Sequence, residues 1–225
     1  MASAPEVGRF TGFPPEAVEF FRRLSADNTK RFWDEHRSTY DSAVKGPMLA
    51  LTAELADEFG TFHLFRPHRD VRFSKDKSPY KTHQGAVTEG EGAEAFYLHI
   101  APDGLWVGSG YHHMARDQLT RFRAAVADDD TGPELEAVVA DLERRYEIGG
   151  EALSTAPRGY PRDHPRIRFL RHKGLTAGRA FGTPSWLDSR RVVSQVAQTW
   201  RGAAAMNEWL ARNVGPSEEP PDERY

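Results

Sequence analysis

The sequence predicts an α+β protein in which several helices flank a small, mainly antiparallel sheet. Two observations favour this fold class. Apolar residues recur every three or four positions in several stretches, which is the period of an amphipathic helix. Residues 95–100 instead alternate strictly before Pro102-Asp103-Gly104, which is the pattern of a β-hairpin. No repeat or linker interrupts residues 10–213, so we expect them to form a single α+β domain.

The first quarter of the chain is predicted to form three helices. The first begins near residues 13–16, because proline suits the first turn and an acid complements the helix dipole there. Asn28 or Thr29 caps the second, whose apolar face includes His36. We interpret His36 as a satisfied histidine at the edge of the core rather than as a ligand. Pro47 opens the third helix.

The remaining elements follow from turn residues and periodicity. In order, we expect a short strand at 69–74, a glycine-rich loop at 85–92, the hairpin at 95–108, helices at 115–127 and from Thr131, an irregular stretch over the first half of 158–181, and one long helix over 187–213. Residues 1–9 should form an N-terminal arm. Residues 214–225 are rich in proline and acid, so we expect a disordered tail.

The composition excludes several kinds of protein and site. The 225 residues include no cysteine, which rules out disulfides, thiolate metal sites and cysteine nucleophiles. No apolar run approaches the roughly 20 residues of a membrane span, and no signal-peptide pattern is present. We therefore expect a cytoplasmic protein without a membrane partner. Nothing in the sequence indicates a particular cofactor, so the cofactor is unknown.

Charge is distributed unevenly along the chain. The formal net charge is −3, but residues 62–83, the first basic segment, carry +4 and residues 157–181, the second basic segment, carry +6. The remainder therefore carries −13. An acidic body with two basic segments indicates a local anion site more than general adhesion to nucleic acid. The alternative is that both segments are solvated loops.

The densest group of functional side chains lies at Arg69–His83, within the first basic segment. Arginine offers bidentate hydrogen bonds to an anion, and lysine offers a mobile point charge. We therefore predict an anion-binding site whose residues are Arg69, Arg72, Lys75, Lys77, Tyr80 and Lys81. The alternative is an ion-pair network that holds a loop together. The segment is not a Walker loop, because it lacks the necessary glycine spacing.

Residues 69–82 also carry a family resemblance. The run Arg-Asp-Val-Arg-Phe-Ser-Lys-Asp-Lys-Ser-Pro-Tyr-Lys-Thr is long and unusual in composition. With Tyr97-x-His99-Ile100-x-Pro102-x-Gly104 and Pro157-x-Gly159-Tyr160, it resembles the domain of unknown function 2461 family. Asp27-Asn28 departs mildly from the usual pattern of that family. The resemblance implies one domain and a shared site, and it supplies no mechanism.

The hairpin contributes the predicted catalytic residues. On its first strand Tyr97 and His99 face away from the apolar side, and the alternation at Asp70 would place that carboxylate on the same side. Histidine there could act as a general acid or base. We therefore name His99, Asp70 and Tyr97 as candidate catalytic residues. The alternative is that Tyr97 and His99 hydrogen-bond beneath a covering helix.

The second basic segment contributes two further candidate ligand-binding residues, Arg168 and Lys173. Arg166, Arg168 and Arg171 could line one edge of a strand. We predict that the two basic segments converge on one cleft, where Arg72 and Arg168 contribute to binding and an exposed lysine such as Lys45 does not. No motif has the spacing of a metal site, so no metal ligand is named.

The function that these residues favour is binding of a phosphorylated or carboxylated small molecule in a basic cleft, and a catalytic role for the cleft stays open. A nucleic-acid-binding protein is one alternative, which the acidic remainder of the chain disfavours. A non-catalytic interaction module with structural ion pairs is the other. A concave pocket that contains Arg72, Lys81 and His99 would favour the first function.

Overall fold

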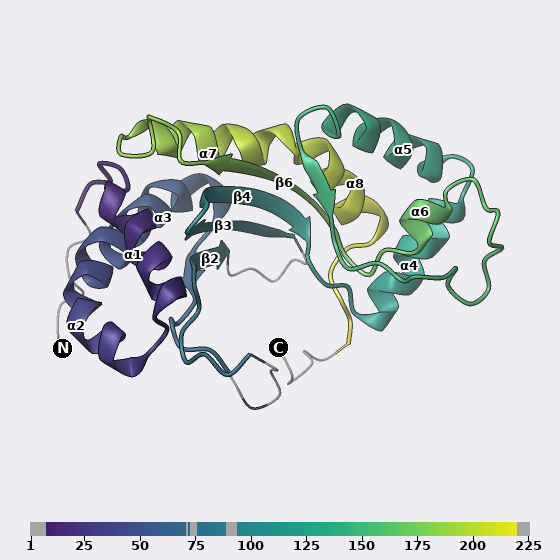
Figure 1. The fold of residues 1–225 in the computed structure, drawn as a ribbon. Helices are drawn as coiled ribbons and strands as arrows, with labels where there is room; N and C mark the ends of the chain where they lie inside the picture. The colour runs from purple at the N-terminus through teal and green to yellow at the C-terminus, as the bar shows by residue number, and fades with distance from the viewer. Residues whose placement is uncertain (1–7, 71, 73–75, 89–93, 220–225) are drawn as a thin grey trace. The chain divides into compact units, whose positions relative to one another are not determined.

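The predicted α+β fold class is confirmed. The structure, a computed structural model, describes residues 8–70, 72, 76–88 and 94–219. Within these residues, six strands form one sheet in the order β1-β2-β3-β4-β6-β5, and helices accompany it (Figure 1). The chain divides by its contacts into two compact units. Unit 1 comprises Met1–Glu89, Tyr97–Val107 and Ala180–Gln198, and unit 2 comprises Gly90–Phe96, Gly108–Arg179 and Thr199–Tyr225.

Unit 1 begins with four helical segments, of which the first two start where the sequence predicts and the start predicted at Pro47 lies within a continuous helical run. They are α1 (Pro15–Ala26), α2 (Lys30–Thr39), the π-helix η1 (Tyr40–Lys45) and α3 (Gly46–Phe59). Thr29 caps α2, because its hydroxyl accepts a hydrogen bond from the Phe32 N–H. His36 is satisfied by the Phe32 carbonyl and by Arg23, as expected of a histidine at the core edge. The continuous passage from α2 through η1 into α3 was not predicted.

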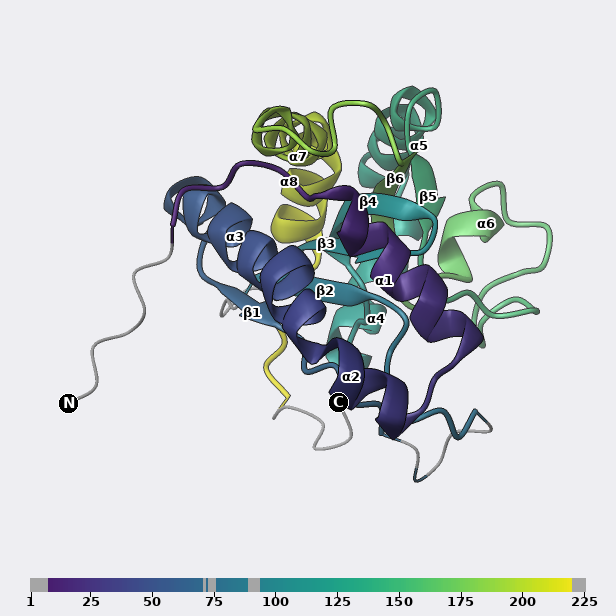
Figure 2. The same cartoon turned by 60° about the vertical axis from the view of Figure 1, so that its left-hand side comes forward.

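The strands of unit 1 differ from the prediction at one place. They are β1 (Phe62–Leu64), β2 (Gln84–Thr88), most of β3 (Ala95–Ala101) and the start of β4 (Gly104–Tyr111). Both β1 and β3 pair antiparallel with β2 (Figure 2). The prediction of a glycine-rich loop from residue 85 is therefore wrong over residues 85–88. Glycine usually weakens a strand, but the Tyr97 ring covers Gly85, and a Cβ there would lie 2.8 Å from the Tyr97 hydroxyl.

The hairpin between β3 and β4 has the predicted register. Leu98 and Ile100 are fully buried, whereas Tyr97 and His99 belong to the other face of the strand. Gly104 has a φ of +108°, and a Cβ there would lie 1.9 Å from the Gly182 carbonyl oxygen, so only glycine fits this turn. Of the strand expected at 69–74, the residues Val71 and Phe73–Lys75 lie outside the described residues. Arg69 and Asp70 are not part of a strand.

Unit 2 is built around its own core. Its elements are α4 (Arg116–Ala127), α5 (Thr131–Leu142), β5 (Glu147–Gly149), α6 (Ile167–Leu170), most of β6 (Leu175–Gly182), the end of α7 (Arg191–Gly202) and α8 (Ala204–Asn213). Phe122, Leu135 and Trp209 from three of the helices are completely buried in this core. The predicted helices at 115–127 and from Thr131 are confirmed.

Two predictions in the C-terminal half are wrong. Residues 167–170 form a short helix, so Arg166, Arg168 and Arg171 do not line a strand edge. The expected long helix over 187–213 is two helices, α7 and α8, which meet near Gly202. A Cβ at Gly202 would lie 2.1 Å from the Tyr146 hydroxyl. Apolar periodicity continues across this break, and so the sequence pattern did not reveal it.

The beginning of the predicted tail makes specific contacts within unit 2. Val214 is buried, and the Gly215 carbonyl accepts a hydrogen bond from the Gln118 side chain. Beyond it, the Ser217 hydroxyl and the Glu218 N–H both donate to the Asp117 carboxylate. These bonds hold the pKa of Asp117 down, at about 2. The ordered part of the chain therefore reaches further than residue 213.

Truncation tests how far the ordered part extends. Removal of residues 216–225 should lower the melting temperature by a few degrees, because the Asp117 carboxylate at the start of helix α4 loses its bonds from Ser217 and Glu218 and keeps only those within its own helix. Removal of residues 220–225 alone serves as the control and should leave the melting temperature unchanged. Equal melting temperatures for the two truncated proteins would show that the contacts with Asp117 do not stabilise the fold.

Candidate functional site

Two stretches of the first basic segment, 67–70 and 79–81, lie antiparallel in unit 1 around a β-bridge between His68 and Tyr80, and we call them, with Arg72 and Asp76, the arm. The Arg69 N–H donates to the Pro79 carbonyl and the Lys81 N–H to the Pro67 carbonyl, at 2.9 and 2.8 Å. The Asn28 side chain binds both backbone groups of Tyr80, at 2.9 and 3.1 Å. The arm is thereby held against the start of helix α2.

Tyr80 anchors the arm. Its ring is 4% exposed and stacks on Trp33, with ring centroids 4.4 Å apart and planes inclined by 9°. Stacked aromatic pairs of this kind contribute about 0.5–1.5 kcal/mol beyond burial. The structure thus gives Tyr80 a packing role, and its predicted contact with a ligand stays a prediction.

Two of the predicted cations are paired within the arm. Arg72 forms a bidentate pair with Asp70, at 3.0 Å from Nε to Oδ1 and 2.6 Å from Nη2 to Oδ2. This guanidinium lowers the pKa of the Asp70 carboxyl to about 2. Arg69 pairs with Asp76 across the arm. These contacts agree with the structural alternative for Arg69 and Arg72. Lys77 is exposed, and Lys75 lies outside the described residues.

Lys81 differs from these cations. Its ammonium lies 5.0 Å from the centre of the Phe65 ring, and the side chain is partly buried. Burial lowers the pKa of Lys81, and the charges of Arg66 and Arg69 lower it further. Among the residues that the structure describes, no carboxylate lies within ion-pair distance of this ammonium. Lys81 is therefore a desolvated cation beside two further cations.

His83 and His99 lie next to each other on the same side of the sheet as Tyr97. Their ring centroids are 5.5 Å apart, and Gly85 is the register partner of His99. Burial, then the charges of Lys81 and Arg69, lower the pKa of His83. His83 therefore lies between His99 and the arm: its ring is next to that of His99, and its pKa is lowered by the charges of Lys81 and Arg69 on the arm. We call Lys81, His83, Tyr97, His99 and Trp106 the histidine face.

His99 is the most unusual residue of the histidine face. Burial, and to a smaller extent His83, lowers its pKa to about 4, while Asp103 acts in the opposite direction. Trp106 lies parallel to the imidazole, at 5.7 Å between centroids and 6° between planes. The His99 Nδ1 is buried and has no hydrogen-bond partner among the described residues. At pH 7 His99 is thus a neutral imidazole with an unsatisfied nitrogen, and its lowered pKa makes it a weaker base than a free histidine.

Of the three predicted catalytic residues, the structure shows Tyr97 and His99 next to each other, whereas Asp70 is bound to Arg72. Tyr97 and His99 are neighbours, with ring centroids 5.5 Å apart, and burial raises the pKa of Tyr97 to about 12. Asp70 is bound to Arg72 on the arm, and the carboxylate that acts on His99 is Asp103. Asp103 was missed because its Asp-Gly turn motif already explained it as a turn residue.

A pocket of about 340 Å³ lies in unit 1 between helix α2, η1 and the chain around β1. Its lining comprises Trp33, Arg37, Tyr40, Asp41, Lys45, Leu64, Phe65, Arg66, Pro67, His68 and Gln84. Arg72, Lys81 and His99, whose presence in one pocket would have favoured the small-molecule function, are not among these residues. Lys45 lines the pocket, so it is unsuitable as the neutral control that the sequence suggested.

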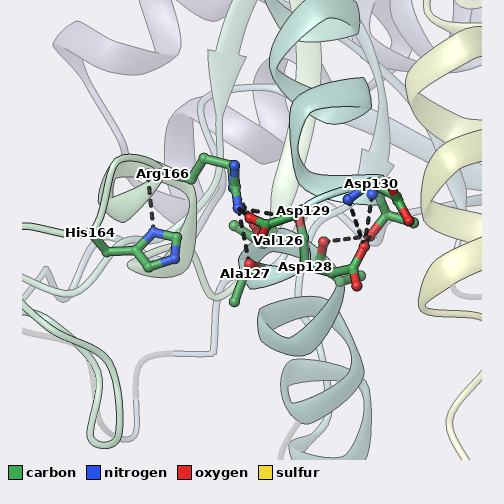
Figure 3. Close-up of polar contacts among 9 residues, drawn as sticks. Val126, Ala127, Asp128, Asp129, Asp130, His164 and Arg166 are labelled. Atoms are coloured by element: carbon green, nitrogen blue, oxygen red, sulfur yellow. Dashed lines mark hydrogen bonds and ion pairs between the residues drawn. The ribbon is translucent and has the colours of Figure 1, made fainter.

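Arg166, the buried cation of the second basic segment, donates hydrogen bonds to backbone carbonyls. Arg166 is 7% exposed and donates from Nε to the Val126 carbonyl at 2.6 Å and from Nη2 to the Ala127 carbonyl at 2.9 Å. Further bonds reach Asp128 and Asp129 (Figure 3). These are the carbonyls at the end of helix α4, which have no partners within the helix. Arg166 therefore serves as a buried C-cap.

Three other cations of this segment also have partners within unit 2. Arg168 pairs with Glu143 at 2.9 Å, and Lys173 pairs with Glu151. Arg171 donates to the carbonyls of Leu153 and Ser154. Acids outside the segment therefore neutralise Arg168 and Lys173, which agrees with the alternative that structural ion pairs hold these charges. Because the two basic segments belong to different units, their convergence on one cleft stays a prediction.

Metal ligands and membrane-spanning helices are the last features to consider. In the described part of the chain, no group of three or more His, Asp or Glu side chains is placed to hold a metal ion. No helix among the described residues is long and apolar enough to cross a membrane. Neither finding names a reaction.

The fold and the site define an α+β protein with a cationic arm and a histidine face. The family model described as a conserved hypothetical protein (DUF2461) matches residues 16–209, and the chain belongs to this family. No curated protein and no solved structure matches the chain.

Proposed function

We propose that unit 1 binds a small phosphorylated or carboxylated anion at the histidine face. The observation that carries this proposal is the Lys81 ammonium, which is partly buried and repelled by Arg66 and Arg69 without a carboxylate partner in the described residues. An uncompensated, desolvated charge is costly, and an anion beside it removes that cost.

The neighbouring histidines give the bound anion a second role. An anion beside Lys81 offsets the charges that keep His83 neutral, so its binding should raise the pKa of His83. His83 then becomes a hydrogen-bond donor to the anion. The buried Nδ1 of His99, which has no partner in the described residues, can form a hydrogen bond with a bound ligand. A ligand with a hydroxyl next to its anionic group would contact both histidines, and because burial lowers the pKa of His99 to about 4, its neutral imidazole serves as a hydrogen-bonding group rather than as a base.

A panel of anions at constant ionic strength tests the proposal. Phosphate, sulfate, citrate and small phosphate esters are compared with chloride by thermal denaturation. A ligand at 100 times its dissociation constant stabilises by about 2.7 kcal/mol, which corresponds to a rise of roughly 5–10 °C for a chain of this size. In Lys81→Gln this rise should be lost.

Lys30→Gln is the matched control, because Lys30 is exposed and pairs only with Asp34 on its own helix. It should keep the full response. If no anion stabilises the protein beyond chloride, or if Lys81→Gln and Lys30→Gln respond alike, the histidine face does not bind an anion. A response confined to long polynucleotides would favour the nucleic-acid alternative instead.

A further inference from the structure

The pocket beside helix α2 is separate from the histidine face. Gln84 lines the pocket, and its side chain accepts a hydrogen bond from the Tyr40 hydroxyl. Its neighbour His83 contacts His99, and successive residues near a strand point to opposite faces. The two sites share a border at Phe65 and Arg66, because both residues line the pocket, the Lys81 ammonium lies 5.0 Å from the Phe65 ring, and the charge of Arg66 acts on Lys81. The other residues that line the pocket do not belong to the histidine face.

The pocket combines aromatic walls with a cationic rim. Trp33 and Tyr40 are buried, and Phe65 adds a third partly buried ring. Three exposed cations, Arg37, Lys45 and Arg66, line the same space with one acid, Asp41. The lining thus carries an excess of two positive charges, and its volume lies within the usual range for small-molecule sites.

The groups left for recognition are the rings and the rim cations. The Gln84 amide is fully used, because its oxygen binds Tyr40 and its nitrogen donates to the Phe65 and Gly85 carbonyls. The pair between Arg37 and Asp41 is long, at 3.7 Å, and the Arg37 side chain is 71% exposed. Exposed pairs of this kind contribute roughly 0–1 kcal/mol, so this guanidinium can turn to an anionic ligand at little cost.

The backbone supplies an independent indication. The chain from Lys30 to Phe59 is helical throughout, but its hydrogen bonding changes to the π pattern over Tyr40–Lys45. Such π segments are rare and occur frequently at functional sites. Here the π segment contributes Tyr40, Asp41 and Lys45 to the pocket. A regular α-helix would present these three side chains at different angles.

We infer that this pocket is a second ligand site, for a planar aromatic acid. The ring of the ligand packs among Trp33, Tyr40 and Phe65, and its carboxylate meets the rim cations. An aliphatic anion lacks the ring contacts, and a neutral aromatic compound leaves the excess positive charge uncompensated. The site therefore requires both parts of the ligand.

Binding of 2-naphthoate, measured by calorimetry, tests this inference. The controls are acetate, which has only the carboxylate, and 2-naphthalenemethanol, which has only the ring. We expect naphthoate to bind at least tenfold more tightly than either control. The double variant Arg37→Gln/Lys45→Gln should weaken naphthoate binding by roughly tenfold or more, since a hydrogen bond to a charged group is worth about 1.5–3 kcal/mol.

Arg31→Gln is the matched control on the same helix. Arg31 also forms an exposed pair with the residue four positions on, Glu35, but it does not line the pocket. It should leave naphthoate binding unchanged. The inference would be overturned if 2-naphthalenemethanol bound as tightly as naphthoate. It would also be overturned if Arg31→Gln weakened naphthoate binding as much as Arg37→Gln/Lys45→Gln does.

Lys81→Gln separates this site from the histidine face. It should abolish the response to phosphate and change naphthoate binding far less than Arg37→Gln/Lys45→Gln does, because Lys81 only borders the pocket at Phe65 and Arg66. The double variant should weaken naphthoate binding and keep the response to phosphate. If Lys81→Gln removes naphthoate binding, the aromatic acid binds at the histidine face and the pocket inference is wrong. If naphthoate binds and phosphate does not, the pocket inference stands and the proposed anion site fails.

Discussion

Replacement of Arg166 by methionine is expected to destabilise the protein by about 3–5 kcal/mol. The guanidinium satisfies the carbonyls of Val126, Ala127 and Asp128 from a position that is only 7% exposed. Methionine fills a similar volume but donates no hydrogen bond. The buried Val126 carbonyl and the partly buried Ala127 carbonyl, left without this donor, cost about 1–3 kcal/mol each, and the end of helix α4 loses its cap. The Asp128 carbonyl is exposed and keeps the Gly132 N–H as a donor. Urea denaturation followed by tryptophan fluorescence measures the change in the free energy of unfolding.

Arg168→Met provides the comparison two residues further on. Arg168 pairs with Glu143 and its side chain is 51% exposed, so its replacement should cost less than about 1 kcal/mol. Similar losses for the two variants would contradict a capping role for Arg166. Arg166→Lys should still be strongly destabilising, because one ammonium cannot reproduce the spread of bonds that the guanidinium makes.

The second large effect concerns pH. Wild-type protein is expected to lose about 3 kcal/mol between pH 6.5 and pH 4 through His99 alone. The folded protein keeps this histidine neutral down to about pH 4, whereas the unfolded chain binds a proton near pH 6.5. Protonation therefore favours the unfolded chain throughout that window. The contribution of His99 to stability is full above pH 6.5 and falls as the pH is lowered.

Comparison with His99→Gln isolates this contribution. The groups that face His99 are His83, Tyr97, Asp103 and Trp106, and His83 adds a smaller effect in the same direction. The difference in unfolding free energy between wild type and His99→Gln should shrink by about 3 kcal/mol from pH 7 to pH 4. NMR titration of the imidazole signals gives the pKa of His99 directly. A value near 6.5 would remove the physical basis of the effect.

Several elements could be predicted because their causes are local. Helix α1 begins at a proline, helix α2 begins at a threonine cap, and the β3–β4 hairpin follows from alternation before an Asp-Gly turn. Each of these signals acts over a few residues, so it is visible in the sequence. Strand β2 was missed because its glycine is acceptable only beneath Tyr97, which is distant in the chain.

The candidate site, too, could be predicted from the sequence only in part. Charge density and alternation marked Lys81, Tyr97 and His99 as residues to consider. They could not show that Arg72 and Arg69 are paired with their own neighbours and that Lys81 is not, because ion pairing depends on how the arm folds back on itself. The pocket beside helix α2 had no sequence signal, since its lining comes from two distant stretches of the chain.

By itself the sequence determined the fold class, the family, most helix starts, the hairpin register and the presence of two basic segments. These depend on short-range periodicity, caps, turns and composition, which act between residues close in the chain. Only the tertiary structure decided which charges are satisfied: Arg166 by the end of helix α4, Arg168 by Glu143, and Lys81 by no carboxylate in the described residues. The physical reason is that desolvation and pairing depend on distances between groups that are far apart in the chain, and packing alone sets those distances.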